Sequence, residues 1–220
     1  MESKPKPRRG RPSRLSREGI VEAALDLIDR AGLQGLTMRA LAHELQADPM
    51  AVYRHVRDKD ELLGAMCDRL LVALEPVDPD QDWEPQLRRL AEQIRERFAA
   101  RPALLPALAA APVTPTSLLI AADTVALLIR AGASAEDAAA GVNAVFSYVL
   151  GYAVVEAAVP PAADHDALRE AALAHLGTND PPPHLDAAID LMNHPGDFHG
   201  GLDLVLSGLR ARLDQEQPAM

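Results

Sequence analysis

The apolar residues of this 220-residue chain recur at the three- and four-residue spacing of helices, not at the alternating spacing of strands. In residues 16–31, for example, Ile20, Ala24 and Leu27 fall on one helical face. No stretch resembles a strand rich in Val, Ile and Thr. Aromatic residues make up 3% of the chain and hydrophobic residues 48%, so the core must consist of Ala, Leu and Val, which suit helix-on-helix packing. The sequence therefore predicts an all-α fold.

Capping residues divide the first third of the chain into four predicted helices, at 16–31, at 37–45, from 48, and at 58–74. Their expected N-caps are Ser16, Thr37, Asp48 and Asp58. Pro49 stands at a first helical position, where its missing N–H costs nothing. Glu61 is expected to complete a capping box with Asp58, and Gly32 to end the first helix.

A Pro- and Asp-rich linker at 75–82 predicts a domain boundary. We expect a flexible basic arm at 1–15, a helix-turn-helix domain with its connecting helix at 16–74, and a larger helical domain at 75–220. Helices of the larger domain are predicted at 83–100, 102–109, 115–131, 135–158, 164–175 and 200–214. The stretch 176–199 has the composition of a long loop, with at most one short helix at 184–192.

The net charge of −10 is unevenly distributed along the chain. Residues 1–60 hold twelve Lys and Arg against nine Asp and Glu, whereas the remainder holds ten against twenty-three. The basic end can approach phosphate groups while the acidic remainder is repelled by them. This asymmetry suits a protein that meets nucleic acid with its N-terminal part.

The only cysteine, Cys67, excludes an internal disulfide framework and a zinc site built on cysteines. The N-terminus is basic and Pro-rich with no apolar segment behind it, unlike a signal peptide. The longest apolar runs are interrupted by Pro106, Pro112 or Asp123, short of the roughly 18 residues that a membrane span needs. We therefore expect a cytoplasmic protein without a membrane partner.

The helices at 37–45 and from 48 are both short and lie within three residues of each other. Only a tight turn fits between them, so they must cross steeply, with the small Ala42 and Ala47 allowing close approach. This is the arrangement that places the second helix in the major groove of DNA.

The run LTMRALAHELQADPMAVYRHVRDKDELLGAM (residues 36–66) is similar to the helix-turn-helix and following helix of the TetR family of bacterial transcription regulators. The shared features are Thr37, Leu41-Ala42, Leu45, Val52-Tyr53, His55-Val56 and Lys59 followed by Glu61-Leu62-Leu63. The family's usual Leu-Gly at the turn is Leu45-Gln46 here, so Gln46 is expected to accept a left-handed backbone. The second half resembles the tetracycline-repressor-like branch more loosely, through its linker and the helix that Trp83 opens.

The resemblance implies two groups of DNA-contacting residues. Those implied to face base edges are Arg39, Pro49, Met50, Ala51 and Arg54, and those implied to contact the phosphate backbone are Thr37, Tyr53, His55 and Lys59. Arg can bind guanine with two hydrogen bonds, whereas Met50 and Ala51 can only make apolar contacts, as with thymine methyl groups. His55 could instead pack on the helix at 58–74. Arg9 and Arg11 in the arm resemble arginines that enter a minor groove, although a solubilising tail fits them as well.

The helix at 135–158 is apolar nearly all round and must be covered on every side, and the helix at 200–214 has one clean apolar stripe. The resemblance implies that the two helices form a four-helix homodimer interface with a second copy. Two half-sites of operator DNA also need two reading helices. Packing of both helices within one chain is the alternative.

Family architecture further implies a cavity for a small-molecule effector among the helices at 83–100, 102–109, 115–131 and 135–158. Its candidate polar residues are Thr116, Asp123, Asn143 and Ser147, with Thr124 and Tyr148 as further candidates. Its candidate walls are Phe98, Leu105, Leu108, Leu119, Leu127 and Phe146. Each of these could instead be a core or surface residue. The scarcity of aromatic residues favours aliphatic lining.

Histidines and acids gather late in the chain at His184, Asp190, His194, Asp197 and His199, but their spacing does not match a helical pair of metal ligands. We expect no metal and no cofactor. Tetracycline repressors bind their metal-chelated drug through a histidine that has no counterpart that we can place in this chain, so tetracycline recognition does not carry over.

The sequence thus predicts a ligand-responsive transcriptional regulator that binds palindromic operator DNA as a homodimer and is released by a small-molecule effector. Repression is the family's default mode. One alternative is an architectural DNA-binding protein without a ligand. Another is an enzyme of the helical domain, although the chain lacks a Gly-rich phosphate loop and a Gly-x-Ser-x-Gly elbow, and Asp164-His165-Asp166 looks like a helix cap.

Overall fold

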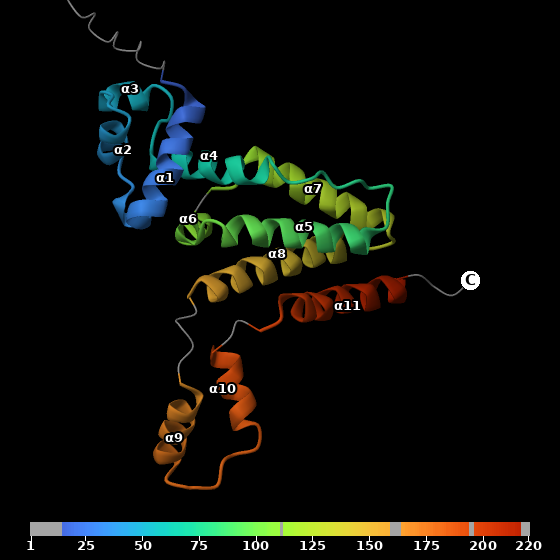
Figure 1. The fold of residues 1–220 in the computed structure, drawn as a ribbon. Helices are drawn as coiled ribbons and strands as arrows, with labels where there is room; N and C mark the ends of the chain where they lie inside the picture. Colours follow the sequence, from blue (N-terminus) through green and yellow to red (C-terminus); the bar gives the residue numbers. More distant parts are fainter. Residues whose placement is uncertain (1–14, 111, 159–163, 194–195, 217–220) are drawn as a thin grey trace, which may run out of the picture.

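A computed structural model describes residues 15–110, 112–158, 164–193 and 196–216, and within these ranges the regular structure is helical throughout, which confirms the all-α prediction (Figure 1). The helices are α1 (Arg17–Gly35), α2 (Met38–Glu44), α3 (Pro49–Tyr53), α4 (Lys59–Leu71), α5 (Trp83–Ala99), the 3-10 turn η1 (Pro102–Leu104), α6 (Leu105–Ala110), α7 (Pro115–Arg130), α8 (Ala135–Ala158), α9 (His165–Leu176), α10 (Leu185–Asn193) and α11 (Phe198–Glu216).

The four predicted N-caps begin α1 to α4. Each side-chain oxygen accepts a hydrogen bond from a backbone N–H of the first turn, at 3.0 Å for Ser16 and Thr37 and 2.8 Å for Asp48 and Asp58. The capping box expected at Glu61 is wrong: its carboxylate accepts from the backbone N–H of Arg57, one residue before the N-cap, at 2.8 Å. The Nε of Arg57 also donates to the Glu61 carboxylate, at 3.0 Å. The carboxylate is therefore held at Arg57 and not at the backbone N–H of Asp58.

Helix boundaries also differ from the predicted ones: the helix predicted at 58–74 ends at Leu71, and three further differences have local reasons. Gly32 interrupts α1 with a φ of 67°, as expected of a stop, but one more turn follows it to Gly35. The predicted helix at 102–109 is divided into η1 and α6, since Pro106 has no N–H for the carbonyl of Pro102, to which Leu105 donates instead. The helix α11 begins at Phe198 because the carboxylate of Asp197 accepts the N–H of His199 at 3.0 Å.

The helices α1 to α4 form an N-terminal unit, which we call the head. Its core lies around Ile20, Ile28, Leu41 and Leu62. Two residues from beyond the linker belong to the same core, Leu104 of η1 and Ala107 of α6, which are 1% and 0% exposed. An ion pair of 2.8 Å between Arg101 and Asp29 of α1 supports this contact. The head and the larger domain therefore interlock, although the linker separates them in sequence.

In the larger domain, α8 packs on α5, α7 and α11, and α7 also packs on α5 (Figure 1). By length and composition alone α8 could cross a membrane, a test that core helices of soluble proteins also pass. Here Val145, Val149 and Ala153 of α8 are buried against its neighbours. The helix α8 is thus the central element of the second core.

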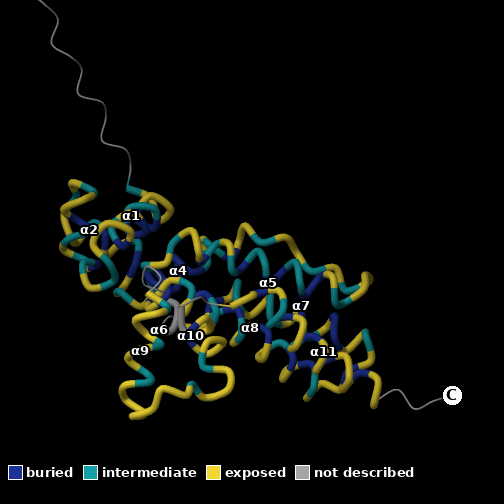
Figure 2. Tube along the Cα trace, turned by 60° about the horizontal axis from the view of Figure 1, so that its bottom comes forward, coloured by how far each residue is buried: buried dark blue, intermediate teal, exposed yellow. Residues whose placement is uncertain are grey.

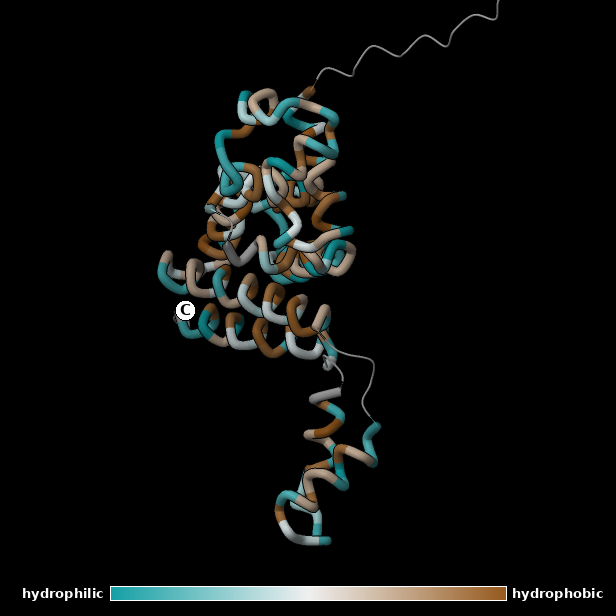
Figure 3. Tube along the Cα trace, turned by 90° about the vertical axis from the view of Figure 1, so that its left-hand side faces the viewer, coloured by the Kyte–Doolittle hydropathy of each residue, from teal (hydrophilic) through white to brown (hydrophobic). Residues whose placement is uncertain are grey.

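The helices α9 and α10 form a hairpin that projects away from the other helices (Figures 1 and 3). They pack mainly on each other, and Ile189 of α10 is buried, whereas α9 has no buried residue. Most of the hairpin is exposed along its length (Figure 2). The short helix expected near residues 184–192 is confirmed as α10.

Replacing Leu104 with Ala tests the interlocking of the two cores. Because Leu104 is 1% exposed, Leu104→Ala should lower the free energy of unfolding by about 2–5 kcal/mol, measured by urea denaturation. Hydrogen exchange should also speed up in α1, on which η1 packs. Leu191→Ala, at a position that is 68% exposed, is the matched control and should change little. Equal effects of the two variants would contradict the assignment.

The pH dependence of stability should report on Glu61. Hydrogen bonds from the Arg57 backbone and from the side chains of Arg17 and Arg57 lower the pKa of Glu61 from 4.5 to about 2. Folding therefore favours the ionised carboxylate, and this contribution is complete above pH 4.5 and is lost as the pH falls toward 2. In that window Glu61→Gln should unfold with a shallower pH dependence than the parent chain, measured by circular dichroism. Glu18→Gln, on the first turn of α1, should keep the parental slope.

Candidate DNA-binding surface and effector cavity

The short helix α3 presents one side to the head core and the other to solvent. Val52 is fully buried, while Met50 and Tyr53 are 68% and 42% exposed. Pro49 and Arg54 are exposed as well, and Ala51 is half-buried. A five-residue helix that exposes a methionine and a tyrosine, and is followed by an exposed arginine at its C-cap, offers apolar and hydrogen-bonding groups together.

The turn between α2 and α3 has the geometry that its length predicts. The N–H of Ala47 bonds to the carbonyl of Ala42 at 2.9 Å, and Gln46 adopts a φ of 50°. The left-handed backbone expected at Gln46 is thus confirmed, where the family more often has glycine. The tight turn sets α3 across α2 at the outer end of the head (Figure 1).

The other predicted DNA-contacting residues lie around this end of the head. Arg39 and Thr37 are exposed at the start of α2, and the Thr37 hydroxyl accepts the N–H of Ala40. His55 is half-buried. Lys59 Nζ donates to the carbonyl of Leu33 at 3.3 Å, so this lysine also fastens α4 to the end of α1. Arg9 and Arg11 lie outside the described residues.

Arg17 has a role that no local pattern in the sequence predicts. Its Nη1 donates to the carbonyl of His55 at 2.8 Å and to Glu61 at 2.7 Å, which ties the start of α1 to the segment between α3 and α4. These residues are 38 and 44 positions away from Arg17, and nothing local in the sequence links them. The orientation of α3 therefore depends on a long-range contact.

A cavity of about 490 Å³ lies among α5, α7 and α8, and we call it the effector cavity after the effector site that the sequence predicts among these helices. Of the predicted ligand residues, Asn143 and Phe146 line it. Thr124 lines it as well, and its hydroxyl donates to the carbonyl of Ile120 at 2.6 Å. Leu71, the last residue of α4, is also part of the wall, so the cavity touches the helix that connects it to the head.

A second, smaller cavity of about 200 Å³ lies between the end of α4, the linker, α5 and α7. The predicted ligand residues Thr116, Leu119 and Asp123 line this cavity and not the larger one. The side chains of Leu71, Leu90 and Ile120 line both cavities. They therefore form a thin apolar wall between two hollow spaces.

The remaining predicted ligand residues lie elsewhere. Phe98 and Leu105 are buried in the core of the larger domain, and Leu127 is buried beside a depression near Trp83. Ser147 is exposed on α8, and Tyr148 donates its hydroxyl to the carbonyl of Phe198 at 2.8 Å. The side chain of Leu108 lies outside the described part of the structure. The helical spacing of apolar residues predicts which side chains are buried. It does not predict which of the buried side chains line a cavity.

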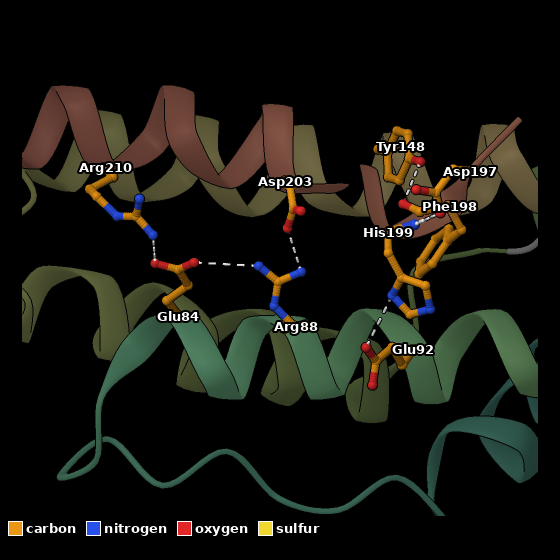
Figure 4. A network of polar contacts seen from close by, with 9 residues as sticks. All are labelled: Glu84, Arg88, Glu92, Tyr148, Asp197, Phe198, His199, Asp203 and Arg210. Atoms are coloured by element: carbon orange, nitrogen blue, oxygen red, sulfur yellow. Dashed lines mark hydrogen bonds and ion pairs between the residues drawn. The ribbon is translucent and has the colours of Figure 1, made fainter. Parts of the chain in front are cut away.

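A row of polar contacts fastens α11 to α5 (Figure 4). Arg88 bonds to Asp203 at 2.6 Å, Glu84 pairs with Arg210, and His199 lies 3.4 Å from Glu92. Hydrogen bonding to Asp203 raises the pKa of Arg88, which is therefore held as a cation. These arginines are thus engaged between α5 and α11.

Within the described ranges, no three His, Cys, Asp or Glu side chains come together as a group that could hold a metal. The late histidines are dispersed: His184 lies in the turn before α10, His199 contacts Glu92, and His194 lies outside the described residues.

Comparisons with known proteins match both halves of the chain. Residues 20–66 match the family model described as bacterial regulatory proteins, tetR family, and residues 75–213 match the model described as tetracyclin repressor-like, C-terminal domain. The HTH-type transcriptional repressor DrrR1 of Streptomyces coeruleorubidus is 33% identical over 67% of this chain. That alignment spans 56% of the length of DrrR1.

Two solved structures are similar over nearly the whole described chain. The TetR family protein ActR of Streptomyces coelicolor, in complex with (S)-DNPA, is 28% identical with a TM-score of 0.75, covering 90% of this chain and 98% of ActR. The second is BioQ with its double-stranded DNA operator; BioQ has also been solved from Mycobacterium smegmatis. The BioQ in this complex is 26% identical with a TM-score of 0.65, covering 90% of this chain and 99% of BioQ. Proteins of this family are transcriptional regulators and not enzymes. The two family models together span most of the sequence, and the chain belongs to the TetR family of transcriptional regulators.

Proposed function

We propose that this chain is a cytoplasmic repressor that binds palindromic operator DNA as a homodimer and releases it when a small-molecule effector enters the cavity. The observation that carries the DNA part is the exposed side of α3 and of its C-cap, where Met50, Tyr53 and Arg54 point away from the head core. Arg54 and Arg39 supply the cations that a polyanion needs at this end of the molecule. In the related BioQ, a complex with operator DNA has been solved.

The dimer part rests on surfaces of α8 and α11 that the chain itself leaves uncovered. On α8 these include Ala144, Gly151 and Val155, and on α11 Leu204 and Gly208. Leu204 is 78% exposed, and no atom lies within 4 Å of a Cβ built on Gly151 or Gly208. Small and apolar residues with open space beside them suit the close packing of two helices from a second copy.

The effector part rests on the contact between the cavity and α4. Leu71 at one end of α4 lines the cavity, and Asp58 at the other end caps the helix beside α3. Near its middle, Gly64 faces the segment between α6 and α7, where a Cβ would meet Thr114 and Pro112 at 3.4 and 3.5 Å. A ligand that displaces Leu71 would tilt α4 and change the spacing of the two α3 helices in a dimer. Such coupling is typically about 1–3 kcal/mol.

Operator binding by an Arg54 variant tests the DNA part. A binding site is first selected from random duplexes and from the DNA upstream of the gene, and affinity is measured by fluorescence anisotropy. Arg54→Ala should weaken binding by about 1–3 kcal/mol and relax the preference at one base pair if the arginine contacts a base. Arg169→Ala in α9 is the control and should bind like the parent. A parent chain that selects no duplex at low salt would refute the regulator proposal.

Arginine at the two open glycines tests the dimer part. Gly151→Arg and Gly208→Arg should fold as monomers, because the added side chain meets nothing within the chain and arginine favours a helix over glycine. In a dimer the same side chains would collide or bring like charges together. Sedimentation velocity measures the outcome, with Ala174→Arg on α9 as the control. If both glycine variants remain dimeric, the interface lies elsewhere.

A further inference from the structure

The lining of the effector cavity carries no charge. Its eighteen side chains are apolar except for Ser117, Thr124 and Asn143, and none of the eighteen is ionisable. Arginines of the adjoining α5 are engaged outside the cavity: Arg88 with Asp203, Arg89 with Glu75 and Arg95 with Glu156. An ion entering this space would lose its hydration and find no counter-ion among the lining residues. The cavity therefore favours an uncharged occupant.

The three polar lining residues are not equally available to a ligand. Ser117 belongs to a capping box, in which its hydroxyl accepts the N–H of Thr114 at 3.0 Å and donates to the Thr114 carbonyl at 2.9 Å. The Thr124 hydroxyl uses its proton on the carbonyl of Ile120. Within the described ranges, the side-chain amide of Asn143 makes no hydrogen bond. Asn143 can thus both donate to and accept from a ligand.

The polar lining residue that is free to bond a ligand, Asn143, lies at the mouth of the cavity and not in its depth. Asn143 and Phe146 are exposed on one turn of α8, and across from them Val113 and Leu118 are 82% and 60% exposed. These four residues form the mouth of the cavity. Thr124, in contrast, is 3% exposed, and the walls near it are aliphatic. A fitting ligand has its polar end outward and its apolar body inward.

On the basis of the proposed function, we propose that the effector is an electrically neutral amphiphile. Its uncharged amide, carbonyl or hydroxyl end is hydrogen-bonded by Asn143, and its hydrocarbon body fills the space between α5, α7 and α8. The volume of about 490 Å³ falls in the range of cavities that hold drug-sized ligands. The lining excludes carboxylates and ammonium ions of the same shape.

A set of probes that differ only in charge tests this inference on the full chain without DNA. Decanamide and 1-decanol are compared with decanoate and decylammonium at pH 7 by isothermal titration calorimetry, with the series from octanamide to tetradecanamide as a check of length. The neutral probes should bind at least about tenfold more tightly than either ion, a difference of about 1.4 kcal/mol. Equal or tighter binding of an ion, or no binding by any neutral probe of the series, would overturn the inference.

Variants of Asn143 locate the polar end. Asn143→Leu should weaken decanamide binding by about three- to tenfold through loss of a hydrogen bond. Asn143→Asp should strengthen decylammonium binding by placing an anion at the mouth. Asn179→Leu, in the exposed turn between α9 and α10, is the matched control and should leave the affinity for every probe unchanged. An Asn143→Leu variant that binds decanamide like the parent contradicts the assigned contact.

A separate measurement of operator release keeps this inference distinguishable from the proposed function. Neutral probes that bind the free protein but leave its operator complex intact would support the ligand chemistry and count against effector-driven release. Operator release by an ion but by no neutral probe would support the regulator and overturn the ligand chemistry.

Discussion

The burial of α8 is the constraint on which the larger domain depends. The sequence predicts that this apolar helix of 24 residues is covered on every side, but α5, α7 and α11 cover one side of it, where Ala138, Gly141, Val145, Val149 and Ala153 are buried. Gly141 allows a close approach of α11, since a Cβ there would meet Leu209 Cδ1 at 2.8 Å. The rest of α8 is largely exposed, both beside the effector cavity at Asn143 and Phe146 and around Gly151, so the candidate ligand site and the candidate dimer surface arise from one packing problem.

The polar contacts between α5 and α11 differ from those in the head in what they connect. Between α5 and α11 they fix two helices side by side, with Arg88 and Glu84 each contacting α11 (Figure 4). In the head, Arg17 and Glu61 instead tie together segments that are more than forty residues apart. The first set engages Arg88 of α5 with α11, and none of the α5 arginines lines the effector cavity. The second set holds α3 in a fixed orientation with its outer face exposed.

Two separate contacts connect the head to the larger domain. The helix α4 runs from beside α3 to the cavity wall at Leu71, while η1 and α6 place Leu104 and Ala107 inside the head core. Any movement of α4 relative to the larger domain must therefore be accommodated at η1 as well. Because close-packed cores tolerate little continuous deformation, two such contacts favour a small number of discrete arrangements over gradual bending.

The sequence by itself determined the helices, their caps and the helix-turn-helix, because hydrophobic periodicity and capping act within a few residues. Thr37, Asp48 and the strained Gln46 could all be placed without a structure. Only the tertiary structure decided that Asn143 borders the cavity whereas Thr116 and Asp123 border another, that Leu104 belongs to the head core, and that Arg17 reaches Glu61. An apolar repeat specifies that a face is buried, but which partner covers it, and where the cover leaves a hollow, depends on the packing of helices far apart in the chain.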